Sequence, residues 1–270
     1  MKTNDGLRTA AKALGIDVEA ESAEFGEVFA RYVNTPQWMK APNGKPSHLT
    51  VRQWIQVRTP AFKKKAGDWE AIIRKRQLER APKATVAVGA FVLDEGQNAQ
   101  QSAKKYFSTP VVKKTEIGGV TIVERSAKDS LAHGYGQRKL DVLATLQNDF
   151  DNAVYLNSRR DFDDKDVMNH YFAYPVSYNG EINYVFCRAR QDINMNRLYV
   201  HEVFSEDEIE KAVPFKPLPN VHLKGLKPHG GTALYKNILQ QILNANPHGV
   251  MADIDENGEP KIVQEGQFHE

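Results

Sequence analysis

The dipeptide Asn179-Gly180 lies between two runs rich in β-branched and aromatic residues, 171–178 and 181–190. Asn-Gly is the preferred pair for a two-residue type I′ turn, because both central positions of that turn need a positive φ. The chain is therefore expected to form a β-hairpin here, and the turn sets its register. The pairs that it predicts are Tyr178 with Glu181, Tyr174 with Val185 and Tyr171 with Arg188.

A third strand is expected over 197–204, which makes a meander with two distinct faces, since alternate side chains of a strand share a face. One face is apolar and predicts a core, with Phe172, Tyr174, Val176, Val185, Cys187, Ala189, Leu198 and Val200. The other face is basic and aromatic, with Tyr171, Tyr184, Phe186, Arg188, Arg190, Arg197, Tyr199 and His201. Arginine and tyrosine together can bind phosphate and stack on bases. The same face also fits a solvated sheet surface with cross-strand cation–π pairs, in which Tyr171, Arg188 and Tyr199 form a row.

Hydrophobic periodicity predicts the remaining elements. They are two short amphipathic helices within 1–40, a loop over 36–46, a helical stretch within 47–69 broken at Thr59-Pro60, a β-like segment over 86–93, a hairpin over 111–123, an amphipathic helix over 137–154 and an apolar stripe at Leu234, Ile238, Leu239 and Ile242. The expected fold class is α+β, with a helical N-terminal region followed by helices packed on one face of an antiparallel sheet.

Charge varies along the chain although the net charge is only +2. A basic stretch lies within 52–83 and an acidic one within 251–270. The basic composition fits either a segment that attracts phosphate or a solvated linker. We therefore expect a helical N-terminal region with a linker over 1–83, an α+β domain over 84–245, and an acidic C-terminal tail or linker over 246–270.

Several chemistries lack their sequence motifs. The single cysteine, Cys187, excludes an internal disulfide framework and reads as a small buried hydrophobe. HExxH, Walker-type, strand–GxGxxG–helix and GxSxG motifs are missing, which argues against metalloprotease, nucleotide-hydrolysing, hydride-transfer and α/β-hydrolase activity. No apolar run is long enough for a membrane helix and no signal peptide is evident, so we expect no membrane partner and a cytoplasmic protein, in the host or delivered by a phage.

The remaining residues suit RNA cleavage without a metal or cofactor, which needs a base for the 2′-hydroxyl, an acid for the 5′-oxygen and cations for the phosphorane. The candidate catalytic residues are His133, His170, His201, Lys139 and Arg188, and the candidate substrate-binding residues are Tyr171, Arg190, Tyr199 and Arg197. Each histidine also fits a structural or surface role. The segment Ser126–Ser130, which precedes the helix predicted over 137–154, fits helix capping as well.

Several segments resemble domains of phage and mobile-element polyvalent proteins. They are Trp54–Lys63 with Gly67–Glu70, Asp255–Pro260, Ser126–Gly134, Asn169–Phe172, Arg197–Val203 and His229–Tyr235. Lys65-Ala66 departs from the Trp-Phe pair that precedes Gly-Asp-Trp in the pattern. The polyvalent-protein-associated domain that 50–245 resembles is similar to the barnase–EndoU–colicin–RelE-like nuclease group. This resemblance implies an α+β, nuclease-like domain whose antiparallel sheet bears the site on its open face.

Three functional hypotheses follow. The first is a metal-independent endoribonuclease-like toxin or effector that acts on RNA, with a possible immunity or host protein as partner. The second is a non-catalytic accessory domain of a polyvalent protein that binds nucleic acid or protein, because binding phosphate does not require turnover. The third is transfer of a group such as ADP-ribose, which has no motif of its own in the sequence.

Overall fold

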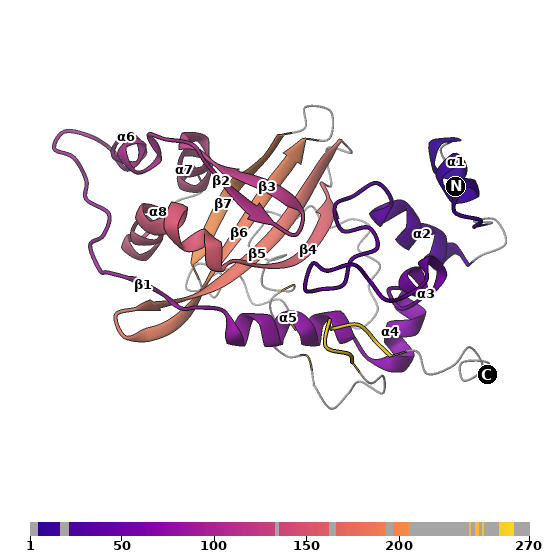
Figure 1. The fold of residues 1–270 in the computed structure, drawn as a ribbon. Coiled ribbons are helices and arrows are strands. Elements are labelled where there is room, and N and C mark those ends of the chain that lie inside the picture. Colours follow the sequence, from indigo (N-terminus) through magenta and orange to yellow (C-terminus); the bar gives the residue numbers. More distant parts are fainter. Residues whose placement is uncertain are drawn as a thin grey trace, which may run out of the picture. The chain divides into compact units, whose positions relative to one another are not determined.

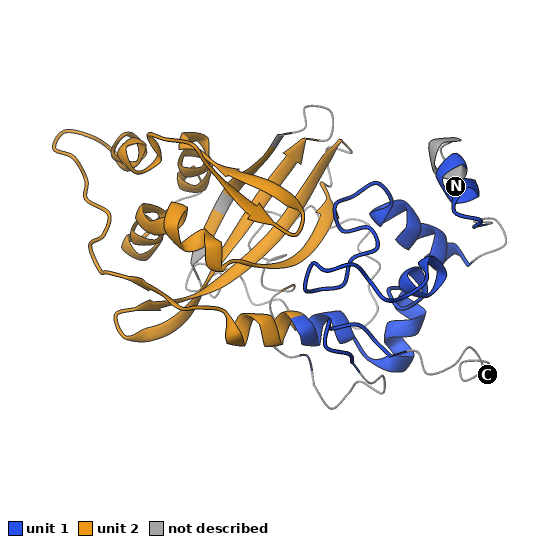
Figure 2. Cartoon of the chain, in the orientation of Figure 1, with its two compact units in different colours: residues 1–73, 245–270 blue, residues 74–244 orange. Residues whose placement is uncertain are grey.

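The computed structural model describes residues 5–16, 22–132, 135–161, 166–192, 197–205, 238, 241–242, 245 and 254–261. The chain divides into two compact units, one formed by 1–73 with 245–270 and the other by 74–244 (Figure 2). Unit 2 is therefore inserted in the sequence of unit 1. The sequence-based boundaries were 83 and 245, whereas the compact units divide after 73 and after 244, so residues 254–261 belong to the same unit as the N-terminal region.

Unit 1 contains short helices, as the periodicity predicts. They are α1 (Asp5–Ala13), α2 (Ala23–Tyr32), α3 (Val51–Gln56), α4 (Pro60–Ala66) and the first part of α5 (Trp69–Arg80). Thr50 forms a capping box with Gln53 at the start of α3, and Thr59 caps α4 with Pro60 as its first residue. The predicted break at Thr59-Pro60 is thus the start of a new helix.

Aromatic side chains form the core of unit 1. Trp54 is 1% exposed and contacts the rings of Tyr32 and Trp38 edge-on. Phe29 in turn contacts Trp38. These contacts join α2 to α3 through the loop over 36–46, which has the irregular backbone expected from its proline and glycine content.

Unit 2 contains the remainder of α5 and every strand, β1 to β7, of the described residues (Figures 1 and 2). Its other elements are β1 (Ala84–Val86), α6 (Ala99–Ala103), η1 (Lys104–Phe107), β2 (Val111–Thr115), β3 (Gly118–Ile122), α7 (Glu124–Leu131), α8 (Gln137–Asp149), η2 (Phe150–Asn152), β4 (Val154–Arg160), β5 (Val167–Tyr178), β6 (Glu181–Asp192) and β7 (Arg197–Ser205). No described helix is both long and apolar enough to cross a membrane.

The strands form one seven-stranded sheet in the order β1-β5-β6-β7-β3-β2, with β4 also paired to β5. The pairs β1–β5 and β3–β7 are parallel, and the others are antiparallel. The sheet is therefore mixed, and the expectation of an antiparallel sheet is wrong. The meander and the hairpin were recognised from adjacent segments, whereas the parallel pairs join strands that are far apart in the chain.

The central hairpin has the predicted register. Tyr178 pairs with Glu181, Tyr174 with Val185 and Tyr171 with Arg188. Asn179 and Gly180 have φ values of 53° and 80°, as a type I′ turn requires.

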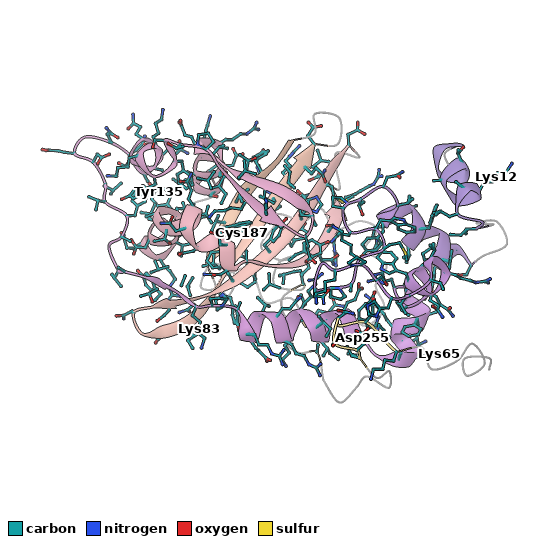
Figure 3. The ribbon with its side chains drawn as sticks, viewed as in Figure 1. Lys12, Lys65, Lys83, Tyr135, Cys187 and Asp255 are labelled. Atoms are coloured by element: carbon teal, nitrogen blue, oxygen red, sulfur yellow. The ribbon has the colours of Figure 1, made fainter. Side chains whose placement is uncertain are left out.

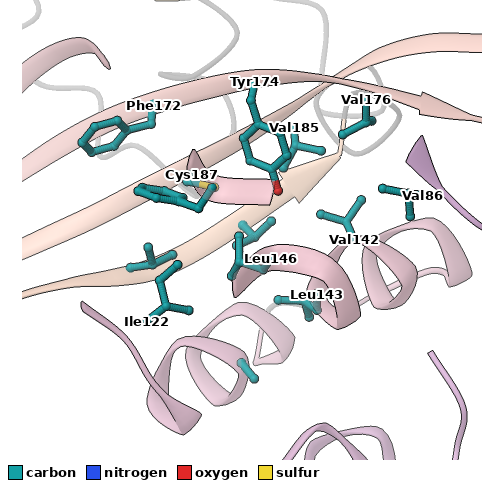
Figure 4. Close-up of a cluster of buried hydrophobic side chains, with 14 of the residues drawn as sticks. Val86, Ile122, Val142, Leu143, Leu146, Phe172, Tyr174, Val176, Val185 and Cys187 are labelled. Atoms are coloured by element: carbon teal, nitrogen blue, oxygen red, sulfur yellow. The ribbon is translucent and has the colours of Figure 1, made fainter. Parts of the chain in front are cut away.

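One face of the sheet packs against α6, α7 and α8 and forms the core of unit 2 (Figure 4). All eight residues of the predicted apolar face lie in or against this core. Cys187 is fully buried within it, and burial raises the pKa of its thiol (Figures 3 and 4). Ile238 and Ile242 of the predicted C-terminal stripe are also buried, while Leu234 and Leu239 lie outside the described residues.

The opposite face differs from the expected open surface. Tyr171 is 2% exposed and Phe186 is fully buried, so this part of the face is closed to solvent. Tyr184, Arg188, Arg190, Tyr199 and His201 are half-buried. Solvent exposure therefore varies across this face, and the partly exposed arginines, Tyr199 and His201 lie on β6 and β7.

The β-like segment over 86–93 is a strand only as far as Val86. Beyond it, the carboxylate of Asp141 on α8 accepts hydrogen bonds from the backbone amides of Gly89 and Phe91 at 3.0 and 2.9 Å. Because this carboxylate takes amides that a strand partner would otherwise take, the apolar sequence continues as a loop.

Candidate functional site

The candidate site lies where α7 meets β7. β3 pairs in parallel with β7 at Thr121 and Tyr199 and ends at Ile122, after which the chain turns into α7. Farther along β7, the backbone amide of Val203 donates to Ser130 Oγ at 3.0 Å, so α7 lies against β7 beyond the end of β3. Ser130 Oγ donates in turn to the carbonyl of Ser126 at 2.7 Å. The helix is thereby fixed against the strand, and its residues face β7 at short range.

A β-bulge sets the orientation of His201. Arg188 pairs with Glu202 and Ala189 pairs with Val200, which leaves His201 as the extra residue on β7. Val200 and Val203 both lie in the core although three positions separate them, as a bulge permits. The predicted row of Tyr171, Arg188 and Tyr199 is wrong, because the register of β6 and β7 places Tyr199 opposite Arg190 instead.

The bulge brings His201 against the carboxylate of Asp129 on α7. Nδ1 of His201 lies 2.9 Å from Asp129 Oδ2, and the Tyr199 hydroxyl lies 3.3 Å from the same nitrogen. A carboxylate can only accept a hydrogen bond, so Nδ1 carries the proton and Nε2 carries the free electron pair. Among the described residues, no hydrogen bond engages Nε2.

Arg125 connects α7 to the same group of side chains. Its Nε lies 3.3 Å from Asp129 Oδ2, and its guanidinium carbon lies 5.2 Å from the centroid of the Tyr199 ring. We call the set Arg125, Asp129, Arg188, Arg190, Tyr199 and His201 the His201 cluster. The side chains of His201 and Asp129 are 17% and 20% exposed, so the cluster is shielded from solvent but not closed.

Burial and the arginines of β6 set the electrostatics of the cluster. Burial, followed by the charge of Arg188, lowers the pKa of His201 to about 4, while Asp129 acts in the opposite direction. The imidazole is therefore neutral at pH 7 and can accept a proton there. Burial raises the pKa of Tyr199, so its phenol remains protonated and can donate. The positive charges of Arg188 and Arg190 disfavour the protonated form of His201. The same charges favour the binding of an anion.

His170 occupies a different environment. It shares a face with Phe172 on β5, and both of its ring nitrogens are engaged, Nδ1 with Ser158 Oγ at 2.6 Å and Nε2 with Gln191 Oε1 at 2.8 Å. Tyr155 extends this network through its hydroxyl, which lies 2.6 Å from Ser158 Oγ. Burial lowers the pKa of His170 to about 4 as well. Unlike His201, however, it has no ring nitrogen left for a ligand.

The other predicted site residues are dispersed. Lys139 is 2% exposed on α8, and Tyr171 is buried in the sheet. Both were expected to be available to a ligand, and neither is exposed to solvent. His133 and the side chain of Arg197 lie outside the described residues, as does the segment His229–Tyr235. The structure thus brings together Arg188, Arg190, Tyr199 and His201 from the predicted set.

Two members of the cluster, Arg125 and Asp129, were not among the predicted site residues. Their spacing of four along a helix places them on one face, which could have indicated them. The helix-capping role considered for Ser126–Ser130 is confirmed for Ser126, because its Oγ accepts a hydrogen bond from the Val123 amide at the start of α7. Among the described residues, no group of three or more histidine, cysteine, aspartate or glutamate side chains is placed to hold a metal ion.

Comparison with known protein families gives a match over helices and strands around this cluster. No curated protein and no solved structure shows significant similarity to the chain. Residues 93–199 match the family model of large polyvalent protein-associated domain 3, a span that includes α7, β6 and Tyr199 and ends two residues before His201. The match supports the polyvalent-protein part of the resemblance and does not extend to a nuclease group. Residues 93–199 of this chain are thus similar to a polyvalent-protein-associated domain.

Proposed function

We propose that the chain is a metal-independent endoribonuclease-like effector of phage or mobile-element origin, which acts on RNA in the cytoplasm through its His201 cluster. The observation that carries the proposal is the 2.9 Å contact between Asp129 Oδ2 and His201 Nδ1 beside two arginines. An oriented, neutral imidazole next to a cationic surface is what general-base catalysis on a phosphodiester needs.

The cluster offers a group for each step of the reaction. His201 Nε2 would take the proton of the ribose 2′-hydroxyl, and Asp129 would stabilise the imidazolium that forms. Arg188 and Arg190 would hold the phosphate and the charge that develops on it. Tyr199 would donate to the departing 5′-oxygen, since its raised pKa keeps the phenol protonated.

The test is incubation of the purified chain with total RNA in the presence of EDTA. We expect cleavage by the wild type and a loss of about 100-fold or more in rate for His201→Ala, the effect typical of removing a general base. Arg190→Ala should weaken RNA binding, whereas Arg160→Ala, an exposed arginine on β4, is the matched control and should behave as wild type. Absence of cleavage by the wild type, or equal rates for all the variants, would refute the catalytic proposal.

The pH profile provides a second readout. A base with a pKa of about 4 remains active at pH 5.5, where an ordinary histidine is mostly protonated. Replacement of Arg188 by methionine removes a charge that lowers the pKa of His201. The acid limb of the profile should therefore move to higher pH in the Arg188→Met variant.

A second candidate function is a non-catalytic module that binds nucleic acid or a host protein. The match to a domain defined by its association with large polyvalent proteins favours it, because such a domain can act by attachment alone. RNA binding that weakens steeply with salt and yields no products would support this function over the first.

A further inference from the structure

Residues 254–260 of unit 1 form a turn that their own sequence closes. The carboxylate of Asp255 accepts hydrogen bonds from the backbone amides of Asn257 and Glu259 at 2.9 and 2.8 Å. The Asp255 amide donates to the Glu259 carbonyl at 2.8 Å, and Ile254 and Pro260 form a β-bridge. Gly258 supplies the positive φ of 84° that the turn needs. Contacts within the segment therefore define the shape of the turn.

The carboxylate of Glu259 lies in a polar site formed by residues about 210 positions earlier in the chain. Ser47 Oγ lies 2.8 Å from both carboxylate oxygens, and the His48 amide donates to Oε2 at 3.3 Å. Arg58 Nη2 lies 3.8 Å from Oε1. Glu259 is 1% exposed, so this recognition takes place away from water, where charged hydrogen bonds are strongest.

The side chain of Asn257 is recognised at both ends. Its Oδ1 accepts from Asn43 Nδ2 at 3.0 Å, and its Nδ2 donates to His48 Nε2 at 3.1 Å. Glu256, the residue between Asp255 and Asn257, is exposed. The site thus contacts Asn257 and Glu259, while Asp255 and Gly258 shape the turn and Pro260 is buried. Together these residues define the pattern Asp-x-Asn-Gly-Glu-Pro, whose second position is exposed.

The site is held in shape by contacts that do not involve the turn. The Arg58 guanidinium lies 3.7 Å from the centroid of the Trp54 ring and donates to the Trp54 carbonyl at 3.0 Å. Trp69 covers it at 5.1 Å, and Glu70 lies 3.4 Å from its Nε. Trp54 Nε1 donates to the Lys40 carbonyl at 3.0 Å, which fixes the ring. A site built in advance costs little ordering entropy when its ligand binds.

From these contacts we infer that residues 40–73 form a peptide-binding site specific for an Asp-x-Asn-Gly-Glu-Pro turn. The chain fills the site with its own residues 255–260, and the site accepts the same turn from a second copy of the chain. The whole of unit 2 separates the turn from its site in the sequence. The contacts of the turn therefore do not require that turn and site belong to the same chain. Exchange of turns between copies would link one chain to the next.

The test uses a labelled peptide of residues 252–262 and full-length chains. In wild type the site is occupied, so the peptide should not bind measurably. In a Glu259→Ala chain the turn loses its buried carboxylate, and the wild-type peptide should bind, whereas a peptide carrying Glu259→Ala should bind at least 10-fold more weakly. Failure of the wild-type peptide to bind a folded Glu259→Ala chain, or equal binding of both peptides, would overturn the inference.

A second measurement leaves every contact of the site intact. A protease site is introduced between residues 247 and 250 of the otherwise wild-type chain, which is then cleaved. The C-terminal piece should remain associated during gel filtration and should be displaced by excess wild-type peptide, but not by the Glu259→Ala peptide. Immediate loss of the piece without rebinding would overturn the inference even if the Glu259→Ala chain proves too unstable to purify.

Discussion

Each of the two units contains an arginine beside aromatic rings and a carboxylate. The two clusters differ in their solvent exposure and in the hydrogen-bonding groups that remain available to a ligand. In unit 1 the Arg58 side chain is 4% exposed, and its nitrogens meet Glu70, Glu259 and two backbone carbonyls. In unit 2 the His201 cluster is partly exposed, and His201 keeps one ring nitrogen without a described hydrogen bond. The closed cluster binds a segment of its own chain, whereas the open one is where we propose that RNA binds.

Under the proposed function, the same chemical groups serve recognition within the chain in unit 1 and recognition of a ligand in unit 2. A buried ion pair holds one arrangement, because removal of either member leaves an uncompensated charge. The His201 cluster is partly exposed, so replacement of one of its arginines is expected to cost less. The comparison can therefore be tested by mutations that remove corresponding groups from the two clusters.

The largest difference is expected between Arg58→Met and Arg190→Met. The first variant leaves the buried carboxylate of Glu259 without its cation and should destabilise unit 1 by about 3–5 kcal/mol. The second should lower stability by no more than about 1 kcal/mol. All three tryptophans, at 38, 54 and 69, lie in unit 1, so urea unfolding followed by tryptophan fluorescence monitors that unit alone. Hydrogen exchange gives the corresponding value for unit 2, and equal losses in the two variants would contradict the comparison.

The fold of unit 2 follows from the sequence where a strong local pattern exists. Asn179-Gly180 fixed the register of β5 and β6 because only a few residue pairs favour that turn. The parallel pairing of β1 with β5 was not predictable in this way, since no turn joins these strands. The loop after Val86 was missed for a similar reason, because its amides are taken by Asp141, about fifty residues later.

The candidate site was predictable only in part. Alternation placed Arg190 and Tyr199 on one face, and they lie opposite each other in the sheet. It could not reveal the bulge at His201, which depends on how β6 pairs with β7, or the contact with Asp129, which depends on how α7 lies against β7. Nor could it separate His170 from His201, since the available nitrogen on each ring is decided by neighbours from other strands and helices.

The second prediction compares these two histidines by pH. Both have a pKa lowered to about 4 in the folded chain, against 6.5 in an unfolded one. The unfolded state therefore binds more protons between about pH 6.5 and 4, so stability should fall as the pH falls through that window. For His170 the loss amounts to about 3 kcal/mol. Urea unfolding at pH 7 and pH 4.5 measures it, and a His170→Gln variant should show a correspondingly weaker pH dependence.

The third prediction compares how the pKa values of the same two histidines respond to an added ligand. An RNA oligonucleotide bound at Arg188 and Arg190 would offset their charge and raise the pKa of His201. His170, with both nitrogens bonded within the fold, should titrate as before. Histidine NMR signals recorded against pH, with and without the oligonucleotide, report both values. Parallel shifts of the two signals, or no shift of either, would remove the distinction.

The smallest effect concerns two turn glycines, one in each unit. Gly258 and Gly180 have φ values of 84° and 80°, so alanine at either position costs about 1–2 kcal/mol in backbone strain. A Cβ at Gly180 would meet no atom within 4 Å, whereas one at Gly258 would lie 3.3 Å from Ile73 Cγ2. Gly258→Ala should therefore cost slightly more than Gly180→Ala.

Peptide binding makes this small difference measurable. Gly258→Ala in the labelled peptide should weaken its binding to the Glu259→Ala chain by about 5–30-fold, the equivalent of 1–2 kcal/mol. A peptide with alanine at the exposed Glu256 position should bind like wild type, because no described contact recognises that side chain. Equal losses for the two peptides would mean that the site responds to the overall acidity of the segment and not to the shape of its turn.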